Sequence, residues 1–487
     1  MRIAAIRNLL LTASVASAAM TSDNLKSCLK SALKEGDSVA FSGDIFYQLV
    51  DAKRYNLNIH VTPAAITFPS SSQEVAAVVK CAADNGYPVQ AKSGGHSYGN
   101  YGLGGVDGAV VVDLKNLQQF SMDTTTWVAT IGSGTLLGDV TQRLHNAGGR
   151  AMSHGTCPQV GSGGHFTIGG LGPTSRQFGA ALDHIVEAEV VLADGSIVTA
   201  SDTQNQDVFF AIKGAASGFG IVTEFKVRTE PAPDTAVKFE YTLKVGSTEE
   251  RATLFKQWQA YVSNPDLTRK LASTLTLLDD SMVITGTFFG TEEEYNALNI
   301  GSQWPGVNGK AIVFQDWLGL VGNWAEDVAL KLVGGIPSHF YAKSTAWTPS
   351  DLMDSDTIDK MFAYIDSADK GSLAWFVLFD FQGGYTNDIP TDATAYAHRD
   401  VLIWMQSYSV SLVGAVRQAQ FDFLDDLNTL VTNDKAPYAA YSGYVDPLLP
   451  DGPEAYWGSN LPRLQQIKKK IDPQNVFRNP QTPSPAS

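Results

Sequence analysis

Two glycine-rich segments hold the side chains that are best able to do chemistry. The first, Ala91–Gly99, surrounds His96, and the second, Ser153–His165, surrounds Cys157. Glycine permits positive φ, so backbone N–H groups in such segments can converge on an anion or a flat ring. Either segment alone is explained by a tight turn with an incidental side chain. Because both occur in one chain, we predict that they share a ligand site.

The N-terminal residues predict a secretory signal peptide. Arg2 and Arg7 precede an apolar stretch over residues 9–15, and small residues follow at 16–19. This pattern predicts cleavage shortly after Ala18 or Ala19, and hence a secreted, extracellular protein. The apolar run is far shorter than the roughly 20 residues that span a bilayer, so a membrane anchor is not expected.

Secretion affects how the three cysteines are interpreted, because oxidising compartments convert paired thiols to disulfides. Cys28 and Cys81 lie in predicted helices over residues 24–34 and 74–85 and are natural partners. Cys157 is left over. A thiol flanked by histidines and backbone N–H donors has its thiolate favoured, so Cys157 is a candidate nucleophile. A buried inert cysteine and a disulfide with an external thiol are the alternatives.

Three other kinds of site account for Cys157 less well. A cysteine protease would pair it with a histidine and an asparagine, but the surrounding glycines match no nucleophile-bearing turn. A zinc site from His154, Cys157 and His165 lacks a fourth ligand at the usual spacing, so no metal is expected. A nicotinamide site needs Gly-x-Gly-x-x-Gly after a strand, with an acidic residue at the right distance, and the chain lacks this pattern.

The charge balance argues against nucleic acid as a partner. The 487-residue chain has a formal net charge of −15, and its only basic run is Lys468–Lys470. Nucleic-acid binding depends on clustered Lys and Arg facing phosphates, so this run is interpreted as a solvated helix face. No stretch after the signal segment is long and uncharged enough to span a membrane, and we expect a monomer that binds neither membrane nor nucleic acid.

The elements that must position these side chains alternate between short helices and strands, which predicts a mixed α+β region. Strands are predicted at 87–91, 109–113 and 127–131, and a hairpin at 185–199. A proline-rich break at 229–233 separates this half from a region with longer strands and helices. The second region has a predicted helix at 247–263, a hairpin at 271–289 turning near Asp279 and Asp280, and a strand at 373–381. A helix at 461–470 follows, and it returns to the first half.

Four segments resemble berberine-bridge-enzyme-like, FAD-linked oxidases of the vanillyl-alcohol-oxidase superfamily. They are Gly94–Gly99, Ser153–His165, Asp207–Phe225 and Tyr456–Phe477. The closer resemblance is to fungal gluco-, chito- and xylooligosaccharide oxidases, and it covers nearly all of the chain after the signal segment. It implies a two-domain α+β fold with an FAD-binding domain at 20–230 and 440–480. A substrate domain follows at 231–439, beside the signal peptide at 1–19 and a disordered tail at 481–487.

The resemblance also implies how the cofactor is held. The residue matching His96 is bonded to the 8α-methyl of the flavin and the residue matching Cys157 to its carbon 6, so one FAD is attached by two covalent bonds. A Cys28–Cys81 disulfide is implied as well. The expected cofactor-binding residues beside these two attachment points are Gly94, Gly95, Ser97, Gly99, Gly161, Gly163, Gly164, His165, Gly220, Ile221, Val222 and Asn460.

On the substrate side the resemblance assigns Tyr444 as the catalytic base and Asp380 as its partner. An ionised Asp380 raises the pKa of a nearby tyrosine, so we expect a relay in which Tyr444 takes the substrate proton while passing its own to Asp380. Sugar contacts are expected from aromatic faces and amides, and oxygen access from a small apolar side chain. The candidates are Tyr98, Trp375 and Gln406 for the sugar and Val160 for oxygen.

These residues predict a secreted oxidase that converts the anomeric hydroxyl of a reducing mono- or oligosaccharide to a lactone and reduces oxygen to hydrogen peroxide. Two departures leave another substrate open. Leu378 stands where related sugar oxidases have a polar amide, and Pro173 lies in a segment that differs from theirs. The alternatives are an oxidase of a fungal secondary metabolite and a non-catalytic binding protein on a decayed flavoenzyme scaffold.

Overall fold

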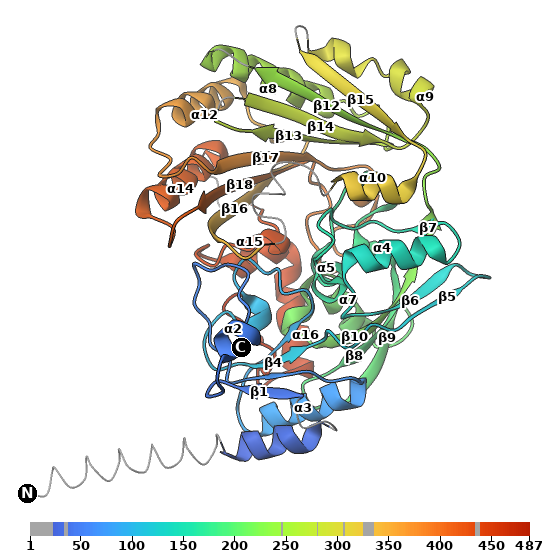
Figure 1. The fold of residues 1–487 in the computed structure, drawn as a ribbon, viewed down its shortest axis with the longest axis vertical. Helices are drawn as coiled ribbons and strands as arrows, with labels where there is room; N and C mark the ends of the chain where they lie inside the picture. The colour runs from blue at the N-terminus through green and yellow to red at the C-terminus, as the bar shows by residue number, and fades with distance from the viewer. Residues whose placement is uncertain are drawn as a thin grey trace, which may run out of the picture.

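A computed structural model describes residues 23–33, 38–244, 247–279, 281–304, 307–324, 336–433 and 439–487. The expected signal peptide at 1–19 and Asp280 of the expected hairpin turn lie outside these ranges. The described residues form the two-domain α+β fold that was predicted. In Figure 1 a large sheet with its helices occupies the upper part, and smaller sheets and helices occupy the lower part.

The lower part contains two main sheets. A four-stranded sheet has the order β1 (Val39–Phe41), β2 (Ala65–Thr67), β4 (Val110–Asp113) and β3 (Val89–Lys92). A five-stranded sheet has the order β5 (Phe120–Asp123), β6 (Val128–Gly132), β10 (Ile221–Arg228), β8 (Ile185–Val191) and β9 (Ile197–Ser201). In the first sheet β2 and β3 both run parallel to β4, whereas the second sheet is antiparallel. Strands β7 (Arg150–Ala151) and β11 (Glu230–Pro231) form a short pair.

The helices of the lower part connect and cover these strands. They are α2 (Tyr47–Val50), α3 (Ser72–Asp84), α4 (Leu137–Asn146), α5 (Ser162–Ile168), α6 (Ser175–Phe178), α7 (Gln206–Ala215), α15 (Gly452–Trp457) and α16 (Leu461–Ile471). Helix α3 begins where the Ser71 side chain accepts a hydrogen bond from the backbone N–H of Glu74, as a capping residue does. Leu464 and Ile467 of α16 share an apolar cluster with Phe210 and Ala211 of α7, so the C-terminal helix returns to the first half of the chain.

The upper part is built on a seven-stranded antiparallel sheet. Its order is β15 (Asn308–Phe314), β12 (Ala236–Lys244), β14 (Ser281–Phe288), β13 (Leu271–Leu277), β17 (Trp375–Phe381), β18 (Ile403–Ser411) and β16 (His339–Trp347). Its helices are α8 (Thr248–Val262), α9 (Glu292–Ala297), α10 (Trp317–Trp324), α12 (Ser355–Ser367), α13 (Tyr385–Asp388) and α14 (Gln418–Thr432). Figure 1 shows α8, α12 and α14 on the outer face of this sheet.

Alternation along β17 decides what each face of the large sheet does. Trp375, Val377 and Phe379 belong to the apolar core that also contains side chains of α8, α12 and α14. Leu378 and Asp380 point the other way and line a cavity. A strand whose neighbouring side chains alternate can therefore bury its odd residues under helices while its even residues face the lower part of the molecule.

The disulfide between Cys28 and Cys81 is confirmed, with 5.8 Å between the Cα atoms. It ties the helix over residues 23–32 to α3.

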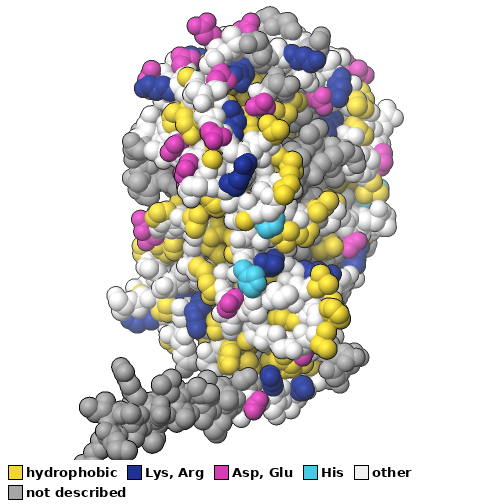
Figure 2. Space-filling model, turned by 60° about the vertical axis from the view of Figure 1, so that its left-hand side comes forward, with side chains coloured by type: hydrophobic (Ala, Val, Ile, Leu, Met, Phe, Trp, Pro, Cys, Tyr) yellow, Lys and Arg dark blue, Asp and Glu magenta, His cyan; other side chains and the backbone are white. Residues whose placement is uncertain are grey.

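Among the described residues no helix is long and apolar enough to cross a membrane. On the face drawn in Figure 2, lysine and arginine side chains are scattered among acidic ones, with hydrophobic side chains between them, so neither sign of charge dominates that face.

The expected disorder of the tail at 481–487 is wrong. Gln481 and Thr482 are buried, and the Gln481 amide donates hydrogen bonds to the carbonyl oxygens of Asp446 and Leu449. Near the end of the tail the Ala486 N–H donates to the carbonyl of Gln465. The proline and serine content suggested disorder, but these polar contacts and the burial of Gln481 hold the tail against the protein.

Candidate active site

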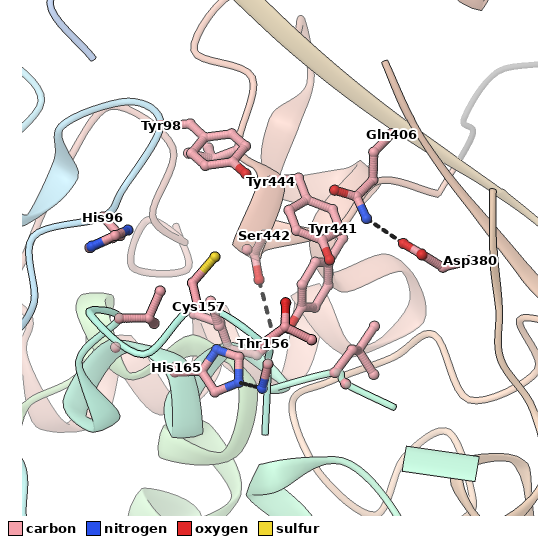
Figure 3. A pocket seen from close by; sticks show the side chains of 18 of the residues that line it. His96, Tyr98, Thr156, Cys157, His165, Asp380, Gln406, Tyr441, Ser442 and Tyr444 are labelled. Carbon is pink, nitrogen blue, oxygen red and sulfur yellow. Dashed lines mark hydrogen bonds between the residues drawn. The ribbon is translucent and has the colours of Figure 1, made fainter. Parts of the chain in front are cut away.

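A cavity of about 670 Å³ lies where the inner face of the large sheet meets the loops of the lower part. Figure 3 shows its interior, with His96 and Cys157 on the loop side and Asp380 and Gln406 on the sheet side. The structure brings most of the predicted site residues to this one cavity. Those that line it are Gly94, Gly95, His96, Ser97, Tyr98, Cys157, Val160, Gly161, Gly164, His165, Asp380, Gln406 and Tyr444.

The two glycine-rich loops touch each other, and their contact requires glycine. A Cβ on Gly94 would lie 2.4 Å from the backbone nitrogen of Gly161, and a Cβ on Gly161 would lie 2.1 Å from the nitrogen of Gly94. The hydroxyl of Ser93 fixes the first loop by donating to the carbonyl of Ser133. Because any side chain would separate the two loops, these glycines keep His96 and Cys157 at the same cavity.

The surroundings of His96 favour its neutral imidazole. Its ring packs against Tyr55 with 4.5 Å between the ring centroids, and burial lowers its pKa to about 4. The neutral form has a free lone pair on one ring nitrogen, which is what a nitrogen nucleophile needs. His96 is therefore chemically suited to form a bond to an electrophilic carbon in the cavity.

Cys157 is the one free cysteine among the described residues. The expectation that its surroundings favour the thiolate is wrong, because burial raises the pKa of the thiol. The neighbouring histidines supply no positive charge. Burial lowers the pKa of His165 to about 3, and the His165 Nε2 accepts a hydrogen bond from the N–H of Gly155. His154 is also buried with a lowered pKa, and it bonds Thr141 through Nε2.

The carboxylate of Asp380 belongs to a chain of hydrogen bonds that crosses three strands. Thr274 on β13 donates to one oxygen at 2.9 Å, and the Gln406 amide on β18 donates to the other. The Gln406 oxygen accepts from the hydroxyl of Tyr408 at 2.5 Å, and Tyr408 in turn pairs with the hydroxyl of Tyr98 at 2.9 Å. Burial raises the pKa of Asp380, while its hydrogen bonds from Thr274 and Gln406 lower it. The nitrogen and the oxygen of the Gln406 amide are thus both hydrogen-bonded to other side chains of the protein.

Tyr444 lines the cavity and lies at the end of a short 3-10 turn over Ser442–Tyr444. Its N–H donates to the carbonyl of Tyr441, and its ring stacks near that of Tyr98 at 6.2 Å between centroids. Burial and the nearby charge of Asp380 raise its pKa well above the usual value for tyrosine. In the described part of the chain, Asp380 acts on Tyr444 through charge and shares no hydrogen bond with it. The phenol form is strongly favoured.

Several predicted residues do not reach this cavity. Trp375 is wrong as a sugar contact, because it lies on the helix-facing side of β17 and packs against Phe423. Asn460 is buried, and its amide donates to the carbonyls of Thr391 and Thr394 instead. Gly99, Gly163, Gly220, Ile221 and Val222 also lie outside the cavity lining. A Cβ on Gly99 would lie 2.5 Å from the ring of Tyr101, so this glycine serves the loop's own packing.

Three residues of the site were missed from the sequence. Thr274 and Tyr408 complete the hydrogen-bond chain to Asp380, and Arg176 supports the residues that follow Asp380. The Arg176 guanidinium donates to the carbonyls of Leu271 and Gln382 and lies 3.6 Å from the ring centroid of Phe381. Tyr408 lies two positions after Gln406, so strand alternation was a signal for it. No sequence pattern pointed to Thr274 or Arg176, because the residues that they contact are remote from them in sequence.

The hydrogen-bond chain gives a pH prediction. The variant Gln406→Leu removes a hydrogen bond that lowers the pKa of Asp380, so that pKa should rise further. If Asp380 must be ionised for activity, the acid limb of the kcat/KM profile moves to higher pH. The matched variant Tyr408→Phe keeps the direct bond to Asp380 and should produce a smaller shift in the same direction. Acid limbs that coincide with that of the parent enzyme would contradict this role for Gln406.

The residues present fit a flavin. Two nucleophilic side chains, His96 and Cys157, face one cavity beside loops whose glycines leave backbone groups uncovered. A Cβ on Gly164 would meet nothing within 4 Å, so there is open space beside this loop. Among the described residues no group of three or more His, Cys, Asp or Glu side chains could hold a metal ion.

Comparisons with known proteins agree with this geometry. Residues 63–201 match a family model described as an FAD binding domain, and residues 440–482 match one described as berberine and berberine like. The chain is 40% identical over 456 residues to the FAD-linked oxidoreductase sorD of Penicillium rubens, covering 92% of this chain and 96% of that protein.

Two solved structures are also similar. The xylooligosaccharide oxidase from Myceliophthora thermophila C1, in complex with xylobiose, has a TM-score of 0.87 and 32% identity, covering 95% of this chain and 100% of that one. The glucooligosaccharide oxidase from Acremonium strictum, described with a 6-S-cysteinyl, 8α-N1-histidyl FAD, has a TM-score of 0.86 and 31% identity. The match covers 95% of this chain and 100% of that one.

The chain belongs to the family of berberine-bridge-enzyme-like, FAD-linked oxidases, which includes the fungal oligosaccharide oxidases. It is an FAD-dependent oxidoreductase, and the prediction of an FAD-binding protein with this fold is confirmed.

Proposed function

We propose that this protein is a secreted carbohydrate oxidase that converts the anomeric hydroxyl of a reducing sugar to a lactone and reduces oxygen to hydrogen peroxide. One observation carries the proposal. A single cavity holds His96 and Cys157 on one wall and Tyr444 with Asp380 on the other. The similarity to oxidases of xylo- and glucooligosaccharides supports a sugar as the substrate.

The cofactor is one FAD attached covalently to both His96 and Cys157. Support comes from the neutral imidazole and free thiol at the same cavity, and from the cysteinyl-histidyl FAD of a similar oxidase. When bound, FAD accepts the hydride that leaves the substrate carbon. Double attachment suits a secreted enzyme, which cannot recover a cofactor lost to a dilute exterior. The glycines of the two loops let backbone N–H groups approach the bound group.

Tyr444 removes the hydroxyl proton from the substrate. Its pKa is raised, so it is a weak acid that does not ionise before substrate arrives. It can take up the substrate proton only while it releases its own, and ionised Asp380 is the acceptor we assign. No hydrogen bond joins the Tyr444 hydroxyl to Asp380 among the described contacts, so the transfer of the tyrosine proton requires a water to bridge them. The relay leaves Tyr444 protonated and Asp380 neutral, so the net charge of the site does not change as the proton moves.

The large sheet offers hydroxyl groups to a polyhydroxy substrate. Four threonines on the cavity side of β13 and β14 extend away from Asp380: Thr274, Thr276, Thr285 and Thr287. In the sheet register Thr285 lies opposite Thr274, which lies opposite Asp380, so hydroxyls follow one another across the strands. The Tyr98 ring adds an aromatic face at the loop side. Hydroxyls beside an aromatic face are the surroundings that sugars bind.

A second candidate function is the oxidation of a less polar fungal metabolite, and the wall around Leu378 favours it. Leu378, Phe376 and Pro173 all line the cavity, and the first two offer no hydrogen bond to a hydroxyl. The FAD-linked oxidoreductase sorD, which is not named as a sugar oxidase, is also 40% identical to this chain.

Val160 also lines the cavity, and it is the residue that we assign to oxygen access for either substrate.

The variant Leu378→Gln should separate the two functions. An amide at this position faces the cavity from β17 and can hydrogen-bond a sugar hydroxyl, which is worth about 0.5–1.5 kcal/mol. For a sugar oxidase we expect KM for xylobiose to fall about three- to tenfold, measured from the initial rate of peroxide release. The apolar control Leu378→Met should leave KM near the parent value. An unchanged or higher KM in Leu378→Gln would favour the apolar substrate.

The function is tested by incubating the secreted protein with glucose, xylobiose, cellobiose and chitobiose while following peroxide. We expect peroxide and the corresponding aldonic acid from at least one sugar. The variant Tyr444→Phe serves as a control for peroxide from contaminants, because it retains the cofactor loops. Absence of peroxide and of flavin bleaching with every sugar would overturn the carbohydrate assignment.

A further inference from the structure

The C-terminal tail touches both of the segments that build the site. Gln481 is buried, and its Oε1 accepts a hydrogen bond from the Tyr101 hydroxyl at 2.7 Å. Its Nε2 donates to the carbonyl oxygens of Asp446 at 2.9 Å and Leu449 at 3.3 Å. Tyr101 follows His96 on the cofactor-side loop, and Asp446 follows Tyr444. One side chain therefore joins two segments that are remote in sequence.

On the cofactor side, the tail is fitted to the loop over residues 96–105. The Tyr101 N–H donates to the hydroxyl of Ser97, the residue next to His96, at 3.1 Å. A Cβ on Gly105 would lie 2.8 Å from the Pro480 ring, so the tail packs directly against this loop. Tyr101 also lines the cavity. A displacement of Tyr101 would therefore be transmitted to the residues around His96.

On the catalytic side, the turn that carries Tyr444 is held by strand β16. Lys343 forms an ion pair with the Asp446 carboxylate at 2.8 Å, and both side chains are largely buried. The adjacent Ser344 hydroxyl accepts from the Tyr441 N–H at 3.1 Å. These contacts fix the two ends of the turn to the large sheet. The Gln481 amide then ties the same turn to the cofactor-side loop of the lower part.

We propose that Gln481 is a positioning residue that couples the cofactor-side loop to the catalytic turn and so sets where Tyr444 lies relative to His96. The inference rests on the proposed function only in naming Tyr444 as the base. An amide is required, because Gln481 accepts from the phenols of Tyr101 and Tyr456 and donates to two carbonyls at once. A glutamate cannot donate to the carbonyls, and an apolar residue hydrogen-bonds none of the four groups.

Hydrogen–deuterium exchange tests the coupling without any substrate. In the FAD-loaded protein, Gln481→Met should speed amide exchange in both 97–105 and 442–449, by about tenfold or more in each. Tyr101→Phe should affect the same two segments to a smaller extent. The double variant should resemble Gln481→Met, because both changes remove the same link. Faster exchange confined to 479–487 would overturn the proposal. Should Gln481→Met not fold, Tyr101→Phe decides by the same criterion.

Steady-state kinetics with xylobiose provide the second readout. A misplaced base lowers kcat more than it changes substrate binding, so Gln481→Met should lose about ten- to a hundredfold in kcat with KM within about threefold. The control Lys469→Ala removes an exposed contact to the carbonyl of Ser487 and should keep parent kinetics. An unchanged kcat in Gln481→Met overturns the positioning role. If the parent enzyme does not oxidise xylobiose, the same kinetics are measured with a sugar that it does oxidise. If it oxidises none of the four sugars, the proposed function fails and exchange alone decides the coupling.

Discussion

Replacing Tyr444 by phenylalanine should lower kcat by about 10²- to 10⁴-fold, the usual contribution of a positioned acid–base group. The variant keeps the ring that packs against Tyr98 and Tyr441 and removes only the hydroxyl. Because that hydroxyl takes the substrate proton in the proposed relay, flavin reduction should slow by the same factor. Stopped-flow measurement of flavin bleaching under anaerobic conditions isolates this step from the reaction with oxygen.

Two controls make the result specific to the proton transfer. The thermal midpoint and the visible spectrum of Tyr444→Phe should match those of the parent, since the lost hydroxyl is not part of the apolar packing. Tyr441→Phe removes a neighbouring phenol that accepts from the N–H of Gly170 and should affect stability more than the intrinsic rate of flavin reduction. A Tyr444→Phe enzyme that reduces its flavin at the parent rate would exclude Tyr444 as the base.

Removing both of the proposed attachment residues, His96 and Cys157, should abolish retention of the flavin on denaturation. In the single variants His96→Ala and Cys157→Ala, the remaining bond still holds the cofactor, so the unfolded protein should stay yellow. In the double variant no covalent bond remains, and all flavin should pass through a filter with the denaturant. This non-additive pattern follows because either bond alone suffices, and absorbance of the retained and filtered fractions measures it directly.

The matched control is His165→Ala, which removes a cavity histidine that accepts from a backbone N–H and is not assigned a covalent bond to the flavin. Its flavin should remain with the protein after unfolding. Complete release from either His96→Ala or Cys157→Ala alone would mean that only one of the two bonds exists.

The loops that hold these two residues could be recognised from sequence because local composition shapes them. The glycines of Ala91–Gly99 and Ser153–His165 are needed where backbone meets backbone, as at the Gly94–Gly161 contact. Cys28 and Cys81 were natural partners because of their predicted helices, and the family resemblance implied the disulfide between them. Asp380 and Leu378 were predicted from the family resemblance, and strand alternation explains why both face the cavity from β17.

Other features depended on contacts that sequence patterns do not reveal. Trp375 looked suited to a sugar. Its side chain instead points to the helix-covered face of β17 and is buried in the core, because neighbouring residues of a strand face opposite sides. The ionisation of Cys157 was misjudged because its burial was not foreseen. Burial raises the pKa of the thiol and lowers the pKa of His154 and of His165. The tail looked disordered from its prolines and serines, but Gln481 finds partners in segments that are remote in sequence.

The two-bond attachment of FAD is the central claim, and tryptic mass spectrometry tests it most directly. Trypsin should release residues 93–115 with His96 and residues 151–176 with Cys157. We expect both peptides in one species whose mass equals their sum with a single FAD, corrected for the hydrogens lost on bonding. Two separate peptides with the masses of unmodified His96 and Cys157 would contradict the account.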